Sequence, residues 1–235
     1  MFESRRKANA ERRTAQTVAV VLALFALFLL FLGTRTSYLL YYAAFLLFII
    51  AGVAFVSGTG ARGPTWSIGA EGEETVARHL SLFEKPYHVI HDVVLPEMRG
   101  NIDHIVLGPN GVFVVETKNH NGLITCNGDS WTQRKVGQLG TPYLGNIGCP
   151  SKQVKRYAVL IRNLIRERLG ISLYVNCVIV FTNTNAVLHI NNPAVAVLKP
   201  RELCEFIKTY PSEVALESQR LEELETIIRP YSQFR

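Results

Sequence analysis

Two long stretches without a charged residue occupy most of the first quarter of this chain, at residues 17–33 and 38–57. A helix that crosses a lipid bilayer needs about 20 apolar residues, within a range of about 17–25. The second stretch meets this length comfortably, the first lies near its lower limit, and only residues 34–37 separate them. The sequence therefore predicts two transmembrane helices that form a hairpin over residues 17–57.

Basic residues predict how this hairpin is oriented. Residues 1–16 include five basic and two acidic side chains, whereas the turn between the two stretches carries Arg35 alone. Because basic residues stay on the cytoplasmic side, we expect a two-pass membrane protein whose N- and C-termini both lie in the cytoplasm. A cleaved signal peptide is the alternative, but no small-residue cleavage pattern follows the first stretch and a second span comes at once. A re-entrant or dimerising hairpin is a third interpretation.

The remainder, about 175 residues, is long enough for one domain with its own core. We expect a Gly- and Pro-rich linker over residues 58–65, a domain over residues 66–210 and a C-terminal helix within residues 211–235. The formal net charge of +6 comes mainly from the N-terminal tail and Arg35, so bulk charge does not identify the partner of the domain. The four cysteines lie far apart without a CxxC pair, which argues against a zinc site and fits a reducing cytoplasm.

Hydrophobic periodicity predicts an α/β (α+β) domain around a mixed central sheet. Helices are expected from about Gly69 and over residues 151–170, the second with a buried stripe formed by Val154, Ala158, Ile161 and Ile165. Strands are expected at residues 87–96, on both sides of a turn in 100–119, at 122–126 and at 172–183. Residues 127–149 are expected to form a long loop anchored by Trp131 and Tyr143. Two closing helices are expected at residues 200–210 and 212–231.

The predicted hairpin GNIDHIVLGPNGVFVVETKN, residues 100–119, carries three charges among apolar residues. Side chains alternate between the faces of a strand, so the length of the turn decides which of them meet. A two-residue loop would place Asp103 opposite Lys118, and a four-residue loop would place it opposite Glu116. Both even loops, which the PNG sequence favours, keep Asp103, Glu116 and Lys118 on one side. The plain alternative is a Glu–Lys ion pair on a solvated face, worth under about 1 kcal/mol.

Two carboxylates and an ammonium on one patch suit metal-assisted hydrolysis of a phosphodiester. Mg²⁺ commonly takes one or two protein carboxylates together with water and phosphate. The lysine can then orient or help deprotonate an attacking water, or neutralise charge that develops on the phosphate.

Five features follow one another in the chain: GAEGE at residues 69–73, the hairpin string, a following G-L-I, a Trp and a helix carrying Gln153. Together they are similar to the NERD (nuclease-related) domain. The resemblance covers roughly residues 66–183. That family resembles the PD-(D/E)xK nucleases, whose core has the order αβββαβ, and it is often joined to membrane segments.

The resemblance implies a role for each matching residue. Asp103 and Glu116 would be metal ligands, Lys118 the catalytic lysine, Glu73 a third acidic ligand on the first helix, and Gln153 a polar residue beside them. It also implies Mg²⁺ or Mn²⁺ as the cofactor and DNA as the substrate, with RNA as the alternative.

Several of these residues have plainer interpretations. Glu73 can simply stabilise a helix N-terminus, and Glu71 or Glu74 can take its place in the site. His104 is expected on the opposite face from Asp103, as a buried or supporting histidine and not as a ligand.

The polar residues after the hairpin are open to two interpretations each. Asn119 either caps the strand or touches substrate, and Gln153 either joins the site or only bonds the backbone. The predicted helix that follows carries most of the domain's basic excess. Its residues Lys152, Lys155 and Arg156 are candidate phosphate contacts for a nucleic acid, or an ordinary solvated face.

Two functions compete on this sequence. The first is a membrane-anchored, Mg²⁺-dependent nuclease acting on DNA. The second is a non-catalytic, membrane-tethered module that binds nucleic acid or serves as a scaffold while keeping the nuclease fold. A third and weaker hypothesis is that the acidic C-terminal helix binds a partner in a membrane system through Leu221, Leu224 and Ile228. The plainer interpretation is that these three residues cap the core of the domain.

Overall fold

The structure is a computed structural model that describes residues 65–96, 98, 100–137, 139–212 and 215–233, with seven single positions between 28 and 49. Apart from those positions, the predicted tail, membrane hairpin and residues 58–64 lie outside the described part. Within that part, no helix is long and apolar enough to cross a bilayer. The chain divides into two compact units, Phe2–Ala70 and Glu71–Arg235, the second including Met1.

The second unit is built on a mixed five-stranded sheet, as the sequence predicts. Its strand order is β1-β2-β3-β7-β9. The first three strands are antiparallel, whereas β7 runs parallel to β3 and β9 runs parallel to β7. The strands are β1 (His88–Val93), β2 (Ile102–Gly108), β3 (Gly111–Lys118), β7 (Val175–Phe181) and β9 (Ala196–Leu198).

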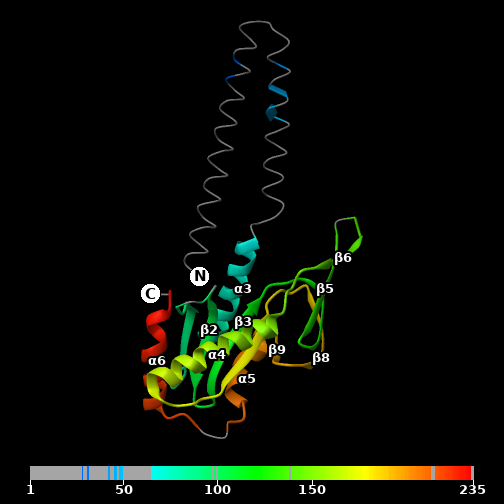
Figure 1. Ribbon diagram of the computed structural model, residues 1–235. Helices are drawn as coiled ribbons and strands as arrows, with labels where there is room; N and C mark the ends of the chain where they lie inside the picture. Colours follow the sequence, from blue (N-terminus) through cyan, green and yellow to red (C-terminus); the bar gives the residue numbers. More distant parts are fainter. Residues whose placement is uncertain are drawn as a thin grey trace. The chain divides into compact units, whose positions relative to one another are not determined.

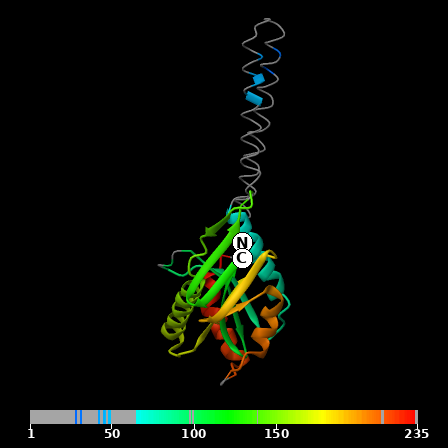
Figure 2. The ribbon, with the colours of Figure 1, turned by 90° about the vertical axis from the view of Figure 1, so that its right-hand side faces the viewer.

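Helices cover both faces of this sheet (Figure 1). On one face, α3 (Thr65–Leu80) and α5 (Pro200–Thr209) pack over a cluster that includes Phe113, Val115 and Val178. On the other face, α4 (Pro150–Leu169) and α6 (Ser218–Ile228) pack over a larger cluster. The two helix pairs lie on opposite sides in Figure 2. This order of elements is the αβββαβ core that the sequence predicts, with α3 starting at the last residue of the expected linker.

The turn between β2 and β3 fixes the register of the site. Gly108 pairs with Gly111, and His104 pairs with Val115, so Asp103 comes beside Glu116 one step further along. The side chain of Asn110 anchors the turn, accepting a hydrogen bond from the Tyr87 hydroxyl at 2.8 Å. Of the two even registers that the sequence allows, the structure has the one in which Asp103 faces Glu116.

A second sheet replaces the long loop expected over residues 127–149, and that prediction was wrong. Its strand order is β6-β5-β4-β8. Trp131 is an anchor as expected, since its indole donates a hydrogen bond to Ser151 Oγ at 3.0 Å. Tyr143, by contrast, is 52% exposed, so the prediction that it anchors this segment was wrong. The strands are β4 (Gly122–Gly128), β5 (Ser130–Val136), β6 (Pro142–Gly145) and β8 (Ala186–Pro193).

The helices that close the domain bury the stripes expected for them. The predicted stripe of α4 is buried, and the helix ends at Gly170, which adopts the left-handed conformation with φ 68°. Leu221, Leu224 and Ile228 of α6 are fully buried in the larger cluster. These three side chains therefore cap the core and are not an exposed docking face. A short 3₁₀ turn, η1 (Arg229–Tyr231), follows α6.

Candidate active site

The candidate site starts at the C-terminal end of β3, where Glu116 and Lys118 lie on the face covered by α4. The side chain of Glu116 is only 3% exposed and that of Lys118 is 16% exposed. Lys118 Nζ donates a hydrogen bond to Glu116 Oε1 at 2.6 Å. This is a buried ion pair and not the solvated surface pair of the plain alternative.

Helix α4 brings a third side chain to this pair. Gln153 Oε1 accepts a hydrogen bond from Lys118 Nζ at 3.1 Å, and Gln153 Nε2 donates to the Tyr157 hydroxyl at 3.2 Å. Helix α4 begins at Pro150, less than one turn before Gln153, and Ser151 between them is buried. The ammonium of Lys118 is therefore held between a carboxylate and an amide oxygen, and Gln153 does more than bond its own backbone.

Asp103 stands next to Glu116 across the β2–β3 ladder. The backbone N–H of Thr117 donates a hydrogen bond to Asp103 Oδ2 at 2.7 Å. Burial, and then the negative charges of Glu116 and Glu73, raise the pKa of Asp103 well above its usual range. Burial also raises the pKa of Glu116, although the charge of Lys118 opposes the rise. The two carboxylates thus repel each other in a poorly hydrated place.

Helix α3 adds Glu73 from the other side of the sheet end. Burial raises the pKa of Glu73, and the charges of Asp92 and Glu116 raise it further. Gly72 makes this approach close, because a Cβ at that position would lie 2.8 Å from Thr182 Oγ1 and 2.9 Å from Asn119 Cβ. Glu71, one of the two alternatives to Glu73, is exposed.

Asp92 on β1 is a neighbour of the site that sequence reasoning missed. Its backbone has φ 51°, a left-handed conformation that is uncommon for residues other than glycine. Its carboxylate accepts a hydrogen bond from Asn101 Nδ2 at 2.8 Å, and its charge raises the pKa of Glu73. An acidic residue inside the largely apolar VIHDVV stretch was the signal available in the sequence.

The three basic candidates on α4 differ in whether an acidic side chain already pairs with them. Lys155 Nζ lies 3.0 Å from both carboxylate oxygens of Asp129, so this residue is already paired. Arg156 is exposed, and its charge lowers the pKa of Glu116, after the larger effects of burial and Lys118. Lys152 is exposed as well. Arg156 is thus the basic residue of the three whose charge reaches the site.

His104 lies on the opposite face from Asp103, as expected, and is not drawn into the site. Its ring is 1% exposed, and its Nδ1 lies 2.7 Å from Nδ1 of His91 on β1. Burial lowers the pKa of both histidines. One neutral ring therefore donates to the other, in the buried role that the sequence favours.

The fit of these residues to a divalent cation is partial. Glu116 Oε2 is buried and has no hydrogen-bond partner within the described part of the chain, so one carboxylate oxygen stays available beside the ion pair. Carboxylate oxygens of Asp103 and Glu116 are ligands that Mg²⁺ accepts in pairs. Among the described residues, however, no three His, Cys, Asp or Glu side chains are grouped to hold a metal. A third ligand from Glu73 therefore stays a prediction.

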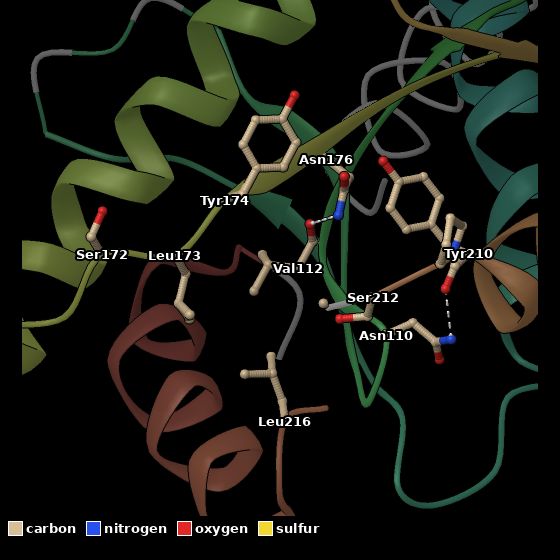
Figure 3. A pocket seen from close by; sticks show the side chains of 11 residues that line it. Asn110, Val112, Ser172, Leu173, Tyr174, Asn176, Tyr210, Ser212 and Leu216 are labelled. Atoms are coloured by element: carbon tan, nitrogen blue, oxygen red, sulfur yellow. Dashed lines mark hydrogen bonds between the residues drawn. The ribbon is translucent and has the colours of Figure 1, made fainter. Parts of the chain in front are cut away.

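A cavity of about 570 Å³ lies away from these residues, at the beginning of β3 (Figure 3). Tyr174, Asn176 and Tyr210 contribute to its wall. Asn176 Nδ2 donates a hydrogen bond to the carbonyl oxygen of Val112 at 3.3 Å, at the opposite end of β3 from Lys118. This cavity does not form part of the carboxylate site.

The mixed sheet between two helix layers, with carboxylates and a lysine at one strand end, has the make-up of a nuclease-like α+β domain. Residues 68–182 match the family model of the nuclease-related domain, NERD. That range contains Glu73, Asp103, Glu116, Lys118 and Gln153. The match therefore supports the resemblance to the nuclease-related domain over this range of the chain.

A protein of Bacillus anthracis, itself described as uncharacterized, is 41% identical over 92 residues. The match covers 35% of this chain and 43% of that protein, so it spans less than half of the relative. No solved structure matches the chain.

Proposed function

We propose that this protein is a membrane-anchored, divalent-metal-dependent nuclease that hydrolyses phosphodiester bonds of DNA. The observation that carries the proposal is the buried lysine–carboxylate pair of Lys118 and Glu116, at 2.6 Å, beside Asp103. A structural role alone does not require repelling carboxylates around a buried pair, since such an arrangement costs stability. Perturbed carboxylates with a specific charge partner are typical of functional sites.

Asp103 and Glu116 would hold the cation, with Glu73 as the third carboxylate. Bound Mg²⁺ or Mn²⁺ would supply positive charge against the phosphate oxygens and offset the repulsion among the carboxylates. Glu116 can serve two partners, because Lys118 uses Oε1 and leaves Oε2 without a hydrogen bond among the described residues.

Lys118 would stabilise negative charge that develops on the phosphate, or orient the attacking water. A preorganised donor stabilises a transition state effectively because it does not have to reorient during the reaction. Its two hydrogen bonds, to Glu116 and Gln153, supply this preorganisation. Arg156 and Lys152, exposed on the same helix as Gln153, would contact phosphates of the bound strand.

The anchoring part of the proposal rests on the uncharged stretches at residues 17–33 and 38–57. In this arrangement both termini and the nuclease domain face the cytoplasm. Flotation of the full chain with lipid vesicles tests the anchor independently of any activity. A chain that stays at the bottom of the gradient would contradict it.

The catalytic proposal is tested with the full chain in detergent micelles, titrated with Mg²⁺ or Mn²⁺ against a panel of DNA and RNA forms. We expect metal-dependent cleavage that Glu116→Gln and Lys118→Ala reduce by about 100-fold or more, the usual effect of losing a key charge-stabilising group. Glu222→Gln, an exposed acid on α6, is the matched control and should cut normally. Cleavage that persists in both site variants would show that the site is assigned wrongly.

One observation favours the non-catalytic alternative, namely that the described residues contain no ready three-ligand metal group. This module would bind nucleic acid with a strong dependence on salt and would cut none of the panel at any metal concentration. The same experiment therefore separates the two functions.

A further inference from the structure

The β5–β6 hairpin carries exposed apolar side chains that the carboxylate site does not use. Leu139 at its tip is 96% exposed, and Val136 and Leu144 are 71% and 74% exposed. With Tyr143, which is 52% exposed, these residues form what we call the apolar arm. Figure 1 shows β5 and β6 projecting from the domain as a narrow arm. Exposed apolar patches mark interaction surfaces, and this hairpin gathers four exposed apolar side chains.

The arm is ordered by its own hydrogen bonds and not by packing on the core. The N–H of Gly137 donates to the carbonyl of Thr141 at 2.9 Å, and the N–H of Gly140 donates to that of Gly137 at 3.0 Å. In the strand ladder, Arg134 pairs with Leu144 and Lys135 pairs with Tyr143. Val136 and Leu144 therefore share one face of the hairpin with Arg134, whereas Tyr143 shares the other face with Lys135.

The charge of the arm has one sign. No acidic residue occurs between Ser130 and Arg166, whereas Arg134 and Lys135 stand at the base of the arm. The arm thus combines aliphatic residues, an aromatic ring and nearby cations. This composition is typical of segments that enter the interface of an anionic membrane. Lysine and arginine can extend to the headgroups while their stems follow the apolar residues.

The arm also lies at a suitable end of the domain. Gly72, in the part of α3 that belongs to this unit, packs against Asn119 and Thr182, and Gly122, three residues beyond Asn119, lies against Arg134 at the base of the arm. In the predicted anchor, only residues 58–64 separate the second uncharged stretch from Thr65. Such a segment reaches at most about 25 Å when fully extended. The end of the domain at which α3 enters therefore stays close to the membrane surface.

We propose that the apolar arm is a second membrane contact, which places the tip of the β5–β6 hairpin in the headgroup layer of an anionic bilayer. This inference rests on the proposed anchoring of the chain. It names a partner that the nuclease site does not imply. A nucleic acid is the weaker partner for this surface, because the tip offers leucine and valine where a phosphate or base would need donors.

The test places a tryptophan at the tip and measures how acyl-chain bromination quenches it. Leu139→Trp is compared with Leu82→Trp, since Leu82 is also an exposed leucine, 68% exposed, but follows the other end of α3. Both full-length variants are reconstituted into phosphatidylcholine vesicles with added phosphatidylglycerol, and the wild-type signal is subtracted for the native tryptophans. We expect quenching and a blue shift for Leu139→Trp and neither change for Leu82→Trp.

A second comparison removes the cations. Arg134→Glu with Lys135→Glu, added to Leu139→Trp, should lose most of the quenching in vesicles that contain phosphatidylglycerol. Equal quenching at positions 139 and 82 would overturn the proposal, as would a blue shift produced by duplex DNA and not by vesicles. Flotation of the same samples keeps the two failures apart, because a chain that floats without quenching contradicts the arm alone, whereas a chain that does not float contradicts the anchor.

Discussion

Asp103 and Glu116 lower the stability of the folded domain, although the proposed function needs them. Burial of the two neighbouring carboxylates raises the pKa of each. Ionising them costs the folded state more than the unfolded chain, in which an aspartate has a pKa of about 3.9. Their stabilising contribution is therefore complete below the unfolded pKa and is lost as the pH rises through the raised folded pKa. A bound cation would restore it.

Asp103→Asn should accordingly be more stable than the wild type at pH 8 without divalent cations, by about 1–2 kcal/mol, because it removes a poorly solvated charge. The asparagine oxygen can still accept the hydrogen bond from Thr117 N. The difference should shrink as the pH falls below about 3.9, the pKa of an unfolded aspartate, because Asp103 is then protonated in both states. Thermal melting across this range checks the trend.

Magnesium gives the matching control for this variant. It should raise the melting temperature of the wild type, because a ligand that binds only the folded state stabilises it. It should leave Asp103→Asn nearly unchanged. A variant that is no more stable than the wild type at pH 8 would contradict the assignment of a strained carboxylate pair.

At the scale of elements, α3 positions Glu73 because glycine lets the helix approach the ends of β3 and β7. A Cβ on Gly72 would meet Thr182 and Asn119 within 3 Å, whereas a Cβ on Gly69, one turn earlier, has open space around it. The two glycines lie in the same helix and differ in this contact. They therefore separate a packing effect from helix propensity.

Gly72→Ala should lower the free energy of unfolding by about 1–3 kcal/mol through overpacking and should lower any metal-dependent cleavage by moving Glu73. Gly69→Ala should instead raise stability by about 0.5–1 kcal/mol, the usual gain of alanine over glycine in a helix. Denaturant unfolding of both variants checks the pair. Equal effects at the two positions would mean that α3 does not depend on this close contact.

The sequence predicts the core well because its local patterns and its tertiary contacts agree there. Turn parity alone places Asp103, Glu116 and Lys118 on one side, and the ladder from Gly108–Gly111 to His104–Val115 confirms one of the two even registers. The second sheet escapes prediction for a physical reason. In strand β5, exposed residues alternate with partly buried ones, and its single buried residue is the polar Gln133, so the strand lacks an apolar stripe.

Long-range pairing supplies what local pattern does not in that sheet. Strand β4 pairs antiparallel with β5 and parallel with β8, which starts at residue 186, far along the chain. The strained Asp92 is hidden for the same reason, since its role depends on Asn101 and Glu73 and not on its neighbours in sequence.

At the scale of the whole domain, the C-terminal segment braces the strand that carries Asp92. Helix α6 lies over β1 and β2, and Ser232 forms a bridge with Val93. Ser232 Oγ donates to the carbonyl of His91 at 2.6 Å, and the N–H of Gln233 donates to that of Asp92 at 2.8 Å. The far end of the chain therefore helps to hold the edge of the site.

Leu224→Ala should destabilise the domain by about 2–5 kcal/mol, the usual cost of emptying a fully buried leucine site. Glu222→Ala, two residues away and exposed, should change stability by no more than about 0.5 kcal/mol. Urea unfolding followed by circular dichroism checks both. A mild effect of Leu224→Ala together with loss of a binding partner would instead support a docking role for α6.

The basic face of α4 gives the last prediction, because its residues differ in distance from the site while sharing one helix. Arg156 and Arg162 are both exposed, but the charge of Arg156 reaches Glu116, and no such effect of Arg162 is found among the groups that perturb the pKa of Glu116. A DNA strand bound at the carboxylates would place its phosphates closer to Arg156 than to Arg162. Arg156→Glu should therefore weaken DNA binding more than Arg162→Glu does.

The salt dependence shows whether the loss is a phosphate contact. Each phosphate contact contributes about 0.9 to the slope of log K against log salt on duplex DNA. Arg156→Glu should thus lower that slope by about 1. Binding is measured with calcium in place of magnesium, or in the Glu116→Gln background, so that no strand is cut. Lys155→Glu, at a residue already paired with Asp129, should change it less. Equal slopes in all three variants would mean that α4 presents a solvated face and that the nucleic acid approaches the site from elsewhere.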